Sequence, residues 1–284
     1  MISYKNKEDF LEQLSNIGGY VEYLGELIAG GRFNHSYGIE FRKWKKENGP
    51  EWNCSSLLQA KENYWWHGSF EVNQKKLNVL SDGIINSSSE CDALYWSMRI
   101  LEWGDVYKGC TGYILNKFEK KSLCQDIKSA VDLLESDNYD LKRFDQNDLR
   151  MDSGLTKIYS LASKKSIILD SRVVASLSLI ACRFFNEDSL DKLKKLSAFA
   201  CGTSNSSEKK RSQIRGVKIF SPYLKPENQA HYNLVTNWIL EAAIIVAKQK
   251  NNQLLGYWSV KNDTGLLRSV ESALFMVGSD ISRG

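Results

Sequence analysis

The sequence predicts an all-α, or α-dominant, fold with few or no strands. It contains only 3 prolines, so helices are seldom interrupted. Apolar residues recur at the three- and four-residue spacing of amphipathic helices over much of the chain. The alternation of apolar and polar residues that is typical of half-buried strands is scarce.

Helical periodicity defines the expected elements in chain order. The predicted helices span residues 7–15, 20–28, 73–80, 89–103, 122–134, 171–185, 189–198, 229–248 and 265–276. Ser89, Ser122 and Ser189 stand where helix N-caps are expected, because a serine hydroxyl accepts a hydrogen bond from a free amide of the first turn. The apolar run 166–169 is compatible with a strand but has no neighbouring strand.

Two polar loops divide the chain into three expected parts. Residues 1–135 form an N-terminal helical part, and 136–200 a hairpin with the candidate catalytic segment. Residues 201–284 comprise a basic loop followed by C-terminal helices. We expect these parts to share one core.

Composition excludes several classes of protein. No apolar run reaches the ~20 residues that a membrane span needs, and the first ten residues are too polar for a secretory signal. A cytoplasmic protein without membrane contact is therefore expected. The 6 cysteines and 3 histidines are scattered, so neither disulfides, nor a metal site, nor a cofactor is predicted. The net charge of +4 permits a nucleic-acid partner without requiring one.

One central segment concentrates residues that can perform chemistry. A turn at Ser153 and Gly154 precedes a short predicted helix over 155–161 and a basic hairpin over 163–166. The apolar residues 167–169 then deliver Asp170 to the first turn of an apolar helix. An aspartate at this position is a common N-cap, because the free amides and the helix dipole stabilise its charge. A cap alone therefore explains Asp170.

The order of these elements suggests a second interpretation. The residues that carry it are 158–162 at the short helix, 167–170 in the apolar approach and 173–177 in the helix that follows. Over about forty residues this segment resembles the core of the helix-hairpin-helix (HhH-GPD) DNA glycosylase superfamily. It departs from the family at residues 151–154, which replace a Gly-Val-Gly hairpin, and at Lys164 and Lys165, which replace loop glycine or proline.

The resemblance implies a helical fold built around this hairpin, loop and helix, with Asp170 as the catalytic carboxylate. Cleavage of an N-glycosidic bond builds positive charge on the sugar, which a fixed carboxylate stabilises while it orients a water. Lys157 is the candidate Schiff-base nucleophile of a bifunctional enzyme. It lies later than the family position, which Ser153 or Gly154 approximates, so a monofunctional hydrolase is favoured.

The implied partner is double-stranded DNA with the target base flipped out. The hairpin amides of Ser153 and Gly154 would face a phosphate. Two groups of basic residues are candidates for further phosphate contacts: Lys164, Lys165 and Arg172, and the loop residues Lys209, Lys210 and Arg211. Ordinary surface charge is an equally good explanation for the presence of both groups.

An extruded base needs an aromatic pocket. Trp103, Tyr107, Trp65 and Trp66 are the candidates, and core packing is the alternative explanation for each of them. Asn233 and Asn237 share one helix face, where their amides would either read a base edge or satisfy buried backbone groups.

Three functions remain open from the sequence. The first is a glycosylase-like enzyme that excises a damaged or modified base, for instance in foreign (phage) DNA. The second is a non-catalytic nucleic-acid-binding protein in which Asp170 only caps its helix. The third is a metal-dependent nuclease that uses Asp170 with Glu187 or Asp188, and it ranks lowest because strands are few.

Overall fold

The computed structural model describes residues 4–38, 42–145, 148–201, 208–222 and 225–283. Its elements in chain order are α1 (Lys7–Ser15), α2 (Tyr20–Ala29), β1 (His35–Gly38), α3 (Arg42–Asn48), β2 (Glu51–Cys54), α4 (Leu57–Glu62), α5 (Phe70–Ile85), α6 (Glu90–Gly104), α7 (Tyr107–Glu119), α8 (Leu123–Leu134), α9 (Leu155–Ala162), α10 (Ser171–Phe184), α11 (Glu187–Leu196), α12 (Glu208–Ser212), α13 (Pro226–Lys250), α14 (Leu254–Tyr257) and α15 (Asp263–Val277). The predicted helix-dominated fold is confirmed, and within the described residues the only sheet has two strands.

Some helices are longer than predicted and others were not predicted. Helix α5 extends to Phe70 and Ile85, well beyond the expected 73–80. Helix α7 was missed because Gly109 and Gly112 lower its helix propensity. Its apolar residues Cys110 and Ile114, one turn apart, nevertheless bury one face of the helix.

The capping predictions have mixed outcomes. Ser89 caps α6 as expected, and its hydroxyl accepts from the amide of Asp92 at 3.1 Å. Ser122 occupies the predicted N-cap position of α8 but makes no side-chain cap hydrogen bond, since the carboxylate of Glu90 accepts from the first two amides of this helix at 2.9 and 3.2 Å. The cap predicted at Ser189 lies three residues earlier, where the Asn186 side chain accepts from the Ser189 amide at 2.9 Å.

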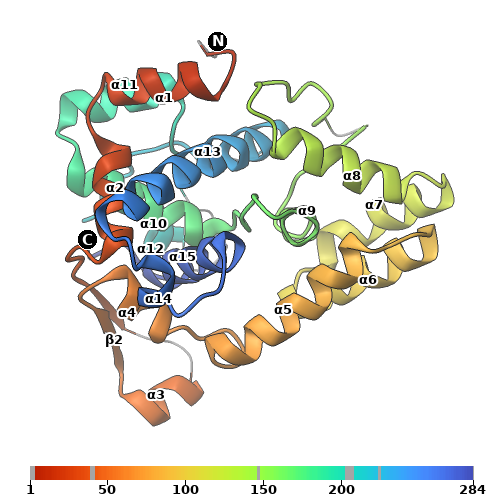
Figure 1. Cartoon of the computed structure of the whole chain (residues 1–284), viewed down its shortest axis with the longest axis horizontal. Coiled ribbons are helices and arrows are strands. Elements are labelled where there is room, and N and C mark those ends of the chain that lie inside the picture. The colour runs from red at the N-terminus through yellow and green to blue at the C-terminus, as the bar shows by residue number, and fades with distance from the viewer. Residues whose placement is uncertain (1–3, 39–41, 146–147, 202–207, 223–224, 284) are drawn as a thin grey trace.

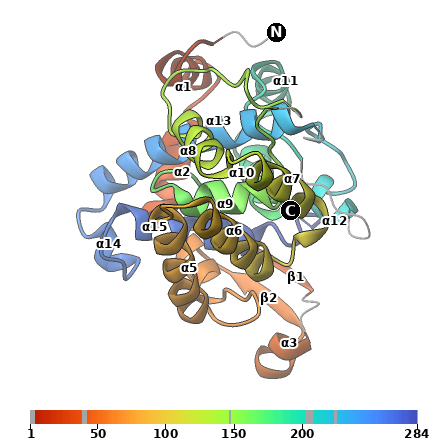
Figure 2. The ribbon, with the colours of Figure 1, turned by 90° about the vertical axis from the view of Figure 1, so that its right-hand side faces the viewer.

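The helices form two groups with α9 between them. Helices α5 to α8 gather on one side of the molecule, at the right of Figure 1, and α9 packs against α5, α6 and α8. On the other side α13 lies along α2, and α10 packs on α15. Figure 2 looks onto the α5–α8 group and shows α9 behind it. The segment that links α9 to α10 therefore connects the two groups.

The two-stranded sheet attaches to α15. Strands β1 and β2 pair antiparallel with Tyr37 opposite Trp52, and these rings stack with centroids 4.8 Å apart. The Tyr37 hydroxyl donates to the carbonyl of Met276 at 2.8 Å. Burial of the hydroxyl is thus matched by a hydrogen bond, as buried polar groups require.

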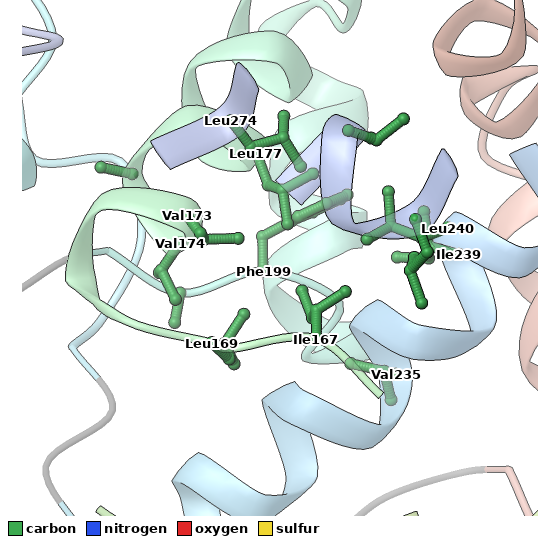
Figure 3. Close-up of a cluster of buried hydrophobic side chains, with 14 of the residues drawn as sticks. Ile167, Leu169, Val173, Val174, Leu177, Phe199, Val235, Ile239, Leu240 and Leu274 are labelled. Atoms are coloured by element: carbon green, nitrogen blue, oxygen red, sulfur yellow. The ribbon is translucent and has the colours of Figure 1, made fainter. Parts of the chain in front are cut away.

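A single hydrophobic cluster includes residues from all three expected parts of the chain. Figure 3 shows its centre, where Ile167 and Leu169 point inward with Val173 and Leu177 of α10. Side chains of α13 and α15, among them Ile239 and Leu274, complete this cluster. Among the described residues, no helix has the length and apolar character needed to cross a membrane.

Gly278, directly after α15, lies against the first turn of α10. A Cβ atom at this position would be 1.7 Å from the carbonyl oxygen of Arg172 and 3.0 Å from its Cα. Both are backbone atoms, so the contact cannot be relieved by a side-chain rotation. The absence of a side chain at Gly278 therefore permits α15 to meet the start of α10.

We predict that Gly278→Ala lowers the free energy of unfolding by about 1–3 kcal/mol, the usual cost of overpacking a closed contact. Urea denaturation measures the change. Gly112→Ala is the matched control, because a Cβ there meets no atom within 4 Å. In the middle of α7 this control should be neutral or stabilise by up to ~1 kcal/mol. Equal stability of Gly278→Ala and the wild type would contradict the packing described.

Candidate active site

The segment between α9 and α10 crosses the interior in an extended form without a partner strand. Its backbone N–H groups are instead satisfied by side chains from three helices. Ile167 donates to Asn237 of α13 at 3.1 Å, and Ile168 to Glu271 of α15 at 2.9 Å. Leu169 donates to the Thr156 hydroxyl of α9 at 3.0 Å. Each bond avoids the cost of an unmet buried donor.

The two asparagines of α13 hold the beginning of this segment. The Asn233 amide donates to the Ile167 carbonyl at 3.2 Å, and its oxygen accepts from the Ser166 hydroxyl at 2.9 Å. Asn237 donates to the Leu134 carbonyl and to the Ser166 hydroxyl, at 3.2 and 3.1 Å. Of the two interpretations left open by the sequence, the structure supports satisfaction of buried backbone groups rather than base reading.

The carboxylate of Asp170 caps α10. Its Oδ1 accepts from the amides of Arg172 at 2.9 Å and Val173 at 3.1 Å. Within the described part of the chain, Oδ2 accepts no hydrogen bond. The side chain is neither buried nor fully exposed. One oxygen thus serves the helix, and the other remains available.

Alternation along the extended segment decides which side chains face a cavity. Successive residues of an extended chain point to opposite sides. Ile167 and Leu169 point into the core (Figure 3), whereas Ile168 and Asp170 line a pocket of about 240 Å³. Its walls come from α5, α6, α9, α10, α12, α15 and the loop that carries Tyr64 and Trp66. We call it the Asp170 pocket.

Lys157 lies in this pocket and is almost completely buried. Its chain runs across Gly104, where a Cβ would be 2.5 Å from Lys157 Cδ. The ammonium donates to the Ser153 carbonyl at 2.8 Å. Burial lowers the pKa of Lys157, and the opposing effect of the Asp170 carboxylate is smaller.

Two predicted tryptophans form an aromatic wall. Trp66 and Trp103 both line the Asp170 pocket and are linked, because the Trp66 indole N–H donates to the Trp103 carbonyl at 3.3 Å. The Trp103 indole N–H donates to Asn73 Oδ1 at 2.9 Å, and the Asn73 amide donates to the Trp66 carbonyl at 2.7 Å. Asn73 therefore holds the Trp103 ring and the backbone of Trp66.

Two predicted arginines bring positive charge to the same pocket. The Arg172 guanidinium lies over the Phe275 ring at 4.3 Å and over Trp66 at 5.3 Å, in cation–π geometry. Its burial lowers the pKa of Arg172. Arg211 of α12 donates to the Ser171 hydroxyl at 2.8 Å. Arg172, Arg211 and Lys157 thus surround the start of α10.

Sequence reasoning missed the contribution of α15. Glu271 lines the pocket and is ion-paired with Arg268 at 2.6 Å, while burial raises the pKa of Glu271. Arg268 also donates to the Ser160 hydroxyl at 2.7 Å, which ties α15 to the end of α9. Phe275 completes the wall. An acidic residue inside an apolar helix was the available signal, but nothing local connects Glu271 with Asp170.

Other predicted residues lie outside the pocket. Trp65 and Tyr107 do not line it, and Tyr107 is exposed. Lys164 and Lys165 are exposed at the opposite end of the extended segment from Asp170. Lys210 does not line the pocket either, and the side chain of Lys209 lies outside the described residues.

The predicted hairpin turn at Ser153 and Gly154 forms the capped beginning of α9. Ser153 lines the pocket, but Gly154 is buried, and a Cβ there would be 2.2 Å from Cys110 Sγ. The amides of Gly154 and Leu155 both donate to Asp152, at 2.9 and 3.0 Å. These bonds cap α9, so the Gly154 amide is already occupied and does not face a phosphate.

The carboxylates required for a metal-dependent nuclease are not brought together. Glu187 and Asp188 begin α11, beyond the far end of α10 from Asp170. The 14 residues of α10 separate them by about 20 Å. Across the described ranges, no group of three or more histidine, cysteine, aspartate or glutamate side chains could hold a metal ion.

Comparisons of the chain with family models, curated proteins and solved structures gave no significant match.

Burial of Lys157 predicts a specific pH dependence. Its folded-state pKa lies below the ordinary value of about 10.4, so between these two values the unfolded chain binds a proton that the folded protein lacks. The wild type therefore gains stability as pH rises through this window, and Lys157→Met does not. Urea denaturation at pH 7 and pH 10 should show the variant losing stability relative to the wild type. Lys192→Met, at an exposed position of α11, is the control without such a change. A pH-independent difference for Lys157→Met would contradict the burial described.

Proposed function

We propose that the protein is a DNA glycosylase-like enzyme that extrudes a damaged or modified base and hydrolyses its N-glycosidic bond. The observation that carries the proposal is the Asp170 pocket, in which a carboxylate, a buried lysine and an aromatic wall meet. These groups come from segments that lie far apart in the sequence. Perturbed titratable groups in a cleft are typical of functional sites.

The size and lining of the pocket suit a single flat group. Its volume of about 240 Å³ is below the roughly 300–1,000 Å³ of sites for drug-sized ligands. Trp66, Trp103 and Phe275 line the pocket with aromatic surface against which an extruded base can pack, beside the Arg172 guanidinium that lies over the Phe275 and Trp66 rings. Arg172 and Arg211 also line the pocket, and their positive charges favour the approach of a phosphate.

In this proposal the two carboxylate oxygens of Asp170 have different roles. Oδ1 is held by the amides of Arg172 and Val173, which fixes the carboxylate in position. Oδ2 is then free to face the developing charge of the sugar and to orient the attacking water. No reorganisation of the carboxylate is needed during the reaction, which is the condition for effective electrostatic stabilisation.

Lys157 contributes differently in this proposal. Its ammonium is bound to the Ser153 carbonyl, and we assign it an electrostatic role opposite Asp170. A lysine with a lowered pKa is also a suitable Schiff-base nucleophile, so a lyase step is the bifunctional variant of the same proposal. Strand breakage before alkali treatment would reveal that step.

A non-catalytic nucleic-acid-binding protein is the second candidate. It is favoured by the complete cap that Asp170 makes, which explains the residue without any reaction. Under this alternative the pocket would hold a base without cleaving its bond.

Asp170→Asn separates the two candidates. Asparagine caps helices as well as aspartate does, so α10 should form normally while the negative charge is lost. We expect base excision to fall about 100-fold or more, as when one charge-stabilising group is removed from other active sites. The assay incubates the protein, without metal, with duplexes that each carry one damaged or modified base, and reveals abasic sites by alkali.

Asp188→Asn is the matched control, because this exposed carboxylate occupies the first turn of α11 outside the pocket. It should excise bases at the wild-type rate. Excision that survives in Asp170→Asn would contradict the proposal. Duplex binding without any base loss by the wild type would favour the non-catalytic candidate.

A further inference from the structure

A second hollow of about 720 Å³ runs along α5 and α6 and adjoins the Asp170 pocket. The two hollows share Trp103, whose ring is fixed by Asn73 at 2.9 Å. Figure 1 shows α5 and α6 side by side at the edge of the molecule. We call this hollow the α5–α6 groove.

The charged residues that line the groove are mainly positive. Lys75 and Lys76 are exposed on α5, and Arg99 is exposed on the facing side of α6. The carboxylate that lines the groove is Glu102, which pairs with Arg99 at 2.6 Å. A screened surface pair of this kind forms and breaks easily. The two lysines thus leave the groove with a positive charge that a chain of phosphates would neutralise.

The groove also presents aromatic rings. Tyr95 is 56% exposed, and its ring meets Trp96 at 5.0 Å in an edge-on arrangement. The Trp96 indole lies against the backbone of α5, because a Cβ at Gly83 would be 2.2 Å from its ring carbons. Gly83 therefore allows Trp96 to pack on α5, where it lines the groove. The neighbouring Tyr95 ring is open to solvent.

We propose that the α5–α6 groove binds an unpaired DNA strand next to the nucleotide that enters the Asp170 pocket. A positively charged groove with exposed aromatic rings is the usual arrangement for single-stranded nucleic acid. A base can stack on the exposed Tyr95 ring only when the face of the base is itself open, which excludes paired bases inside a duplex. The shared wall at Trp103 lets one strand occupy both hollows.

This inference rests on the proposed function for the role of the bound strand, but strand binding itself is measured separately from catalysis. It defines the substrate class as DNA that is locally opened around the target base. Extrusion of a base from an already opened segment costs less free energy than extrusion from intact duplex. The preference for opened DNA would follow from the groove rather than from the pocket.

The test is fluorescence anisotropy with a labelled single-stranded oligonucleotide of mixed sequence and with the matching duplex. Tyr95→Ala should weaken binding of the single strand about fivefold or more, because one stacked base is lost. Lys75→Ala/Lys76→Ala should reduce the salt dependence of binding, with the slope of log K against log salt falling by about 1.4. The control is Lys192→Ala/Lys195→Ala on α11, which lies far from the groove (Figure 1) and should bind as the wild type does.

The outcomes separate the two proposals. The proposal that the groove binds an unpaired strand would be overturned by wild-type affinity and salt dependence in both groove variants. Tighter binding of the duplex than of the single strand would also overturn it. Single-strand binding that is weakened as expected, in a protein that excises no base, would support the groove and contradict the proposed catalysis. Normal base excision, together with unchanged single-strand binding in the groove variants, would support the proposed catalysis and contradict strand binding in the groove.

Discussion

The fold depends on one constraint: an extended segment without a partner strand has to cross the interior between α9 and α10. The buried N–H groups of Ile167, Ile168 and Leu169 are satisfied by side chains, because Asn237, Glu271 and Thr156 supply the acceptors from three different helices. Each unmet buried donor would cost about 1–3 kcal/mol, so together they rival the net stability of a typical domain. The polar network is therefore as essential to this fold as the apolar cluster around it.

The same network determines what the site can do. Because the segment is held in register, Ile167 and Leu169 enter the core while Ile168 and Asp170 face the pocket. The two oxygens of Asp170 differ, since Oδ1 accepts both cap hydrogen bonds of α10 and Oδ2 remains available in the pocket. A helix cap and a catalytic carboxylate are thus compatible assignments for one residue. The cap supplies the rigidity that electrostatic catalysis requires.

Local sequence patterns predicted the helical fold and much of the site, because helix periodicity and the context of Asp170 are short-range features. The pocket indeed brings Asp170 together with Lys157, Trp66, Trp103 and two of the predicted basic residues, Arg172 and Arg211. Lys164 and Lys165 are near Asp170 in the sequence but do not line its pocket, because the extended chain carries them to the other end of the segment, and their phosphate contacts stay a prediction. Glu271 and Phe275 could not be predicted, since only tertiary packing places α15 beside a segment about a hundred residues earlier. The role of Asn233 and Asn237 required the same long-range information.

Native-state hydrogen exchange by NMR measures whether side chains hold the extended segment rigidly. The amides of Ile167, Ile168 and Leu169 lie outside any helix or strand, so secondary structure alone gives no reason for protection. If the side chains hold the segment, these amides exchange as slowly as buried amides in the middle of α13, with the free energy of global unfolding. Exchange at the rate of exposed loop amides would show that the segment opens locally, and that Asp170 is not held against the pocket.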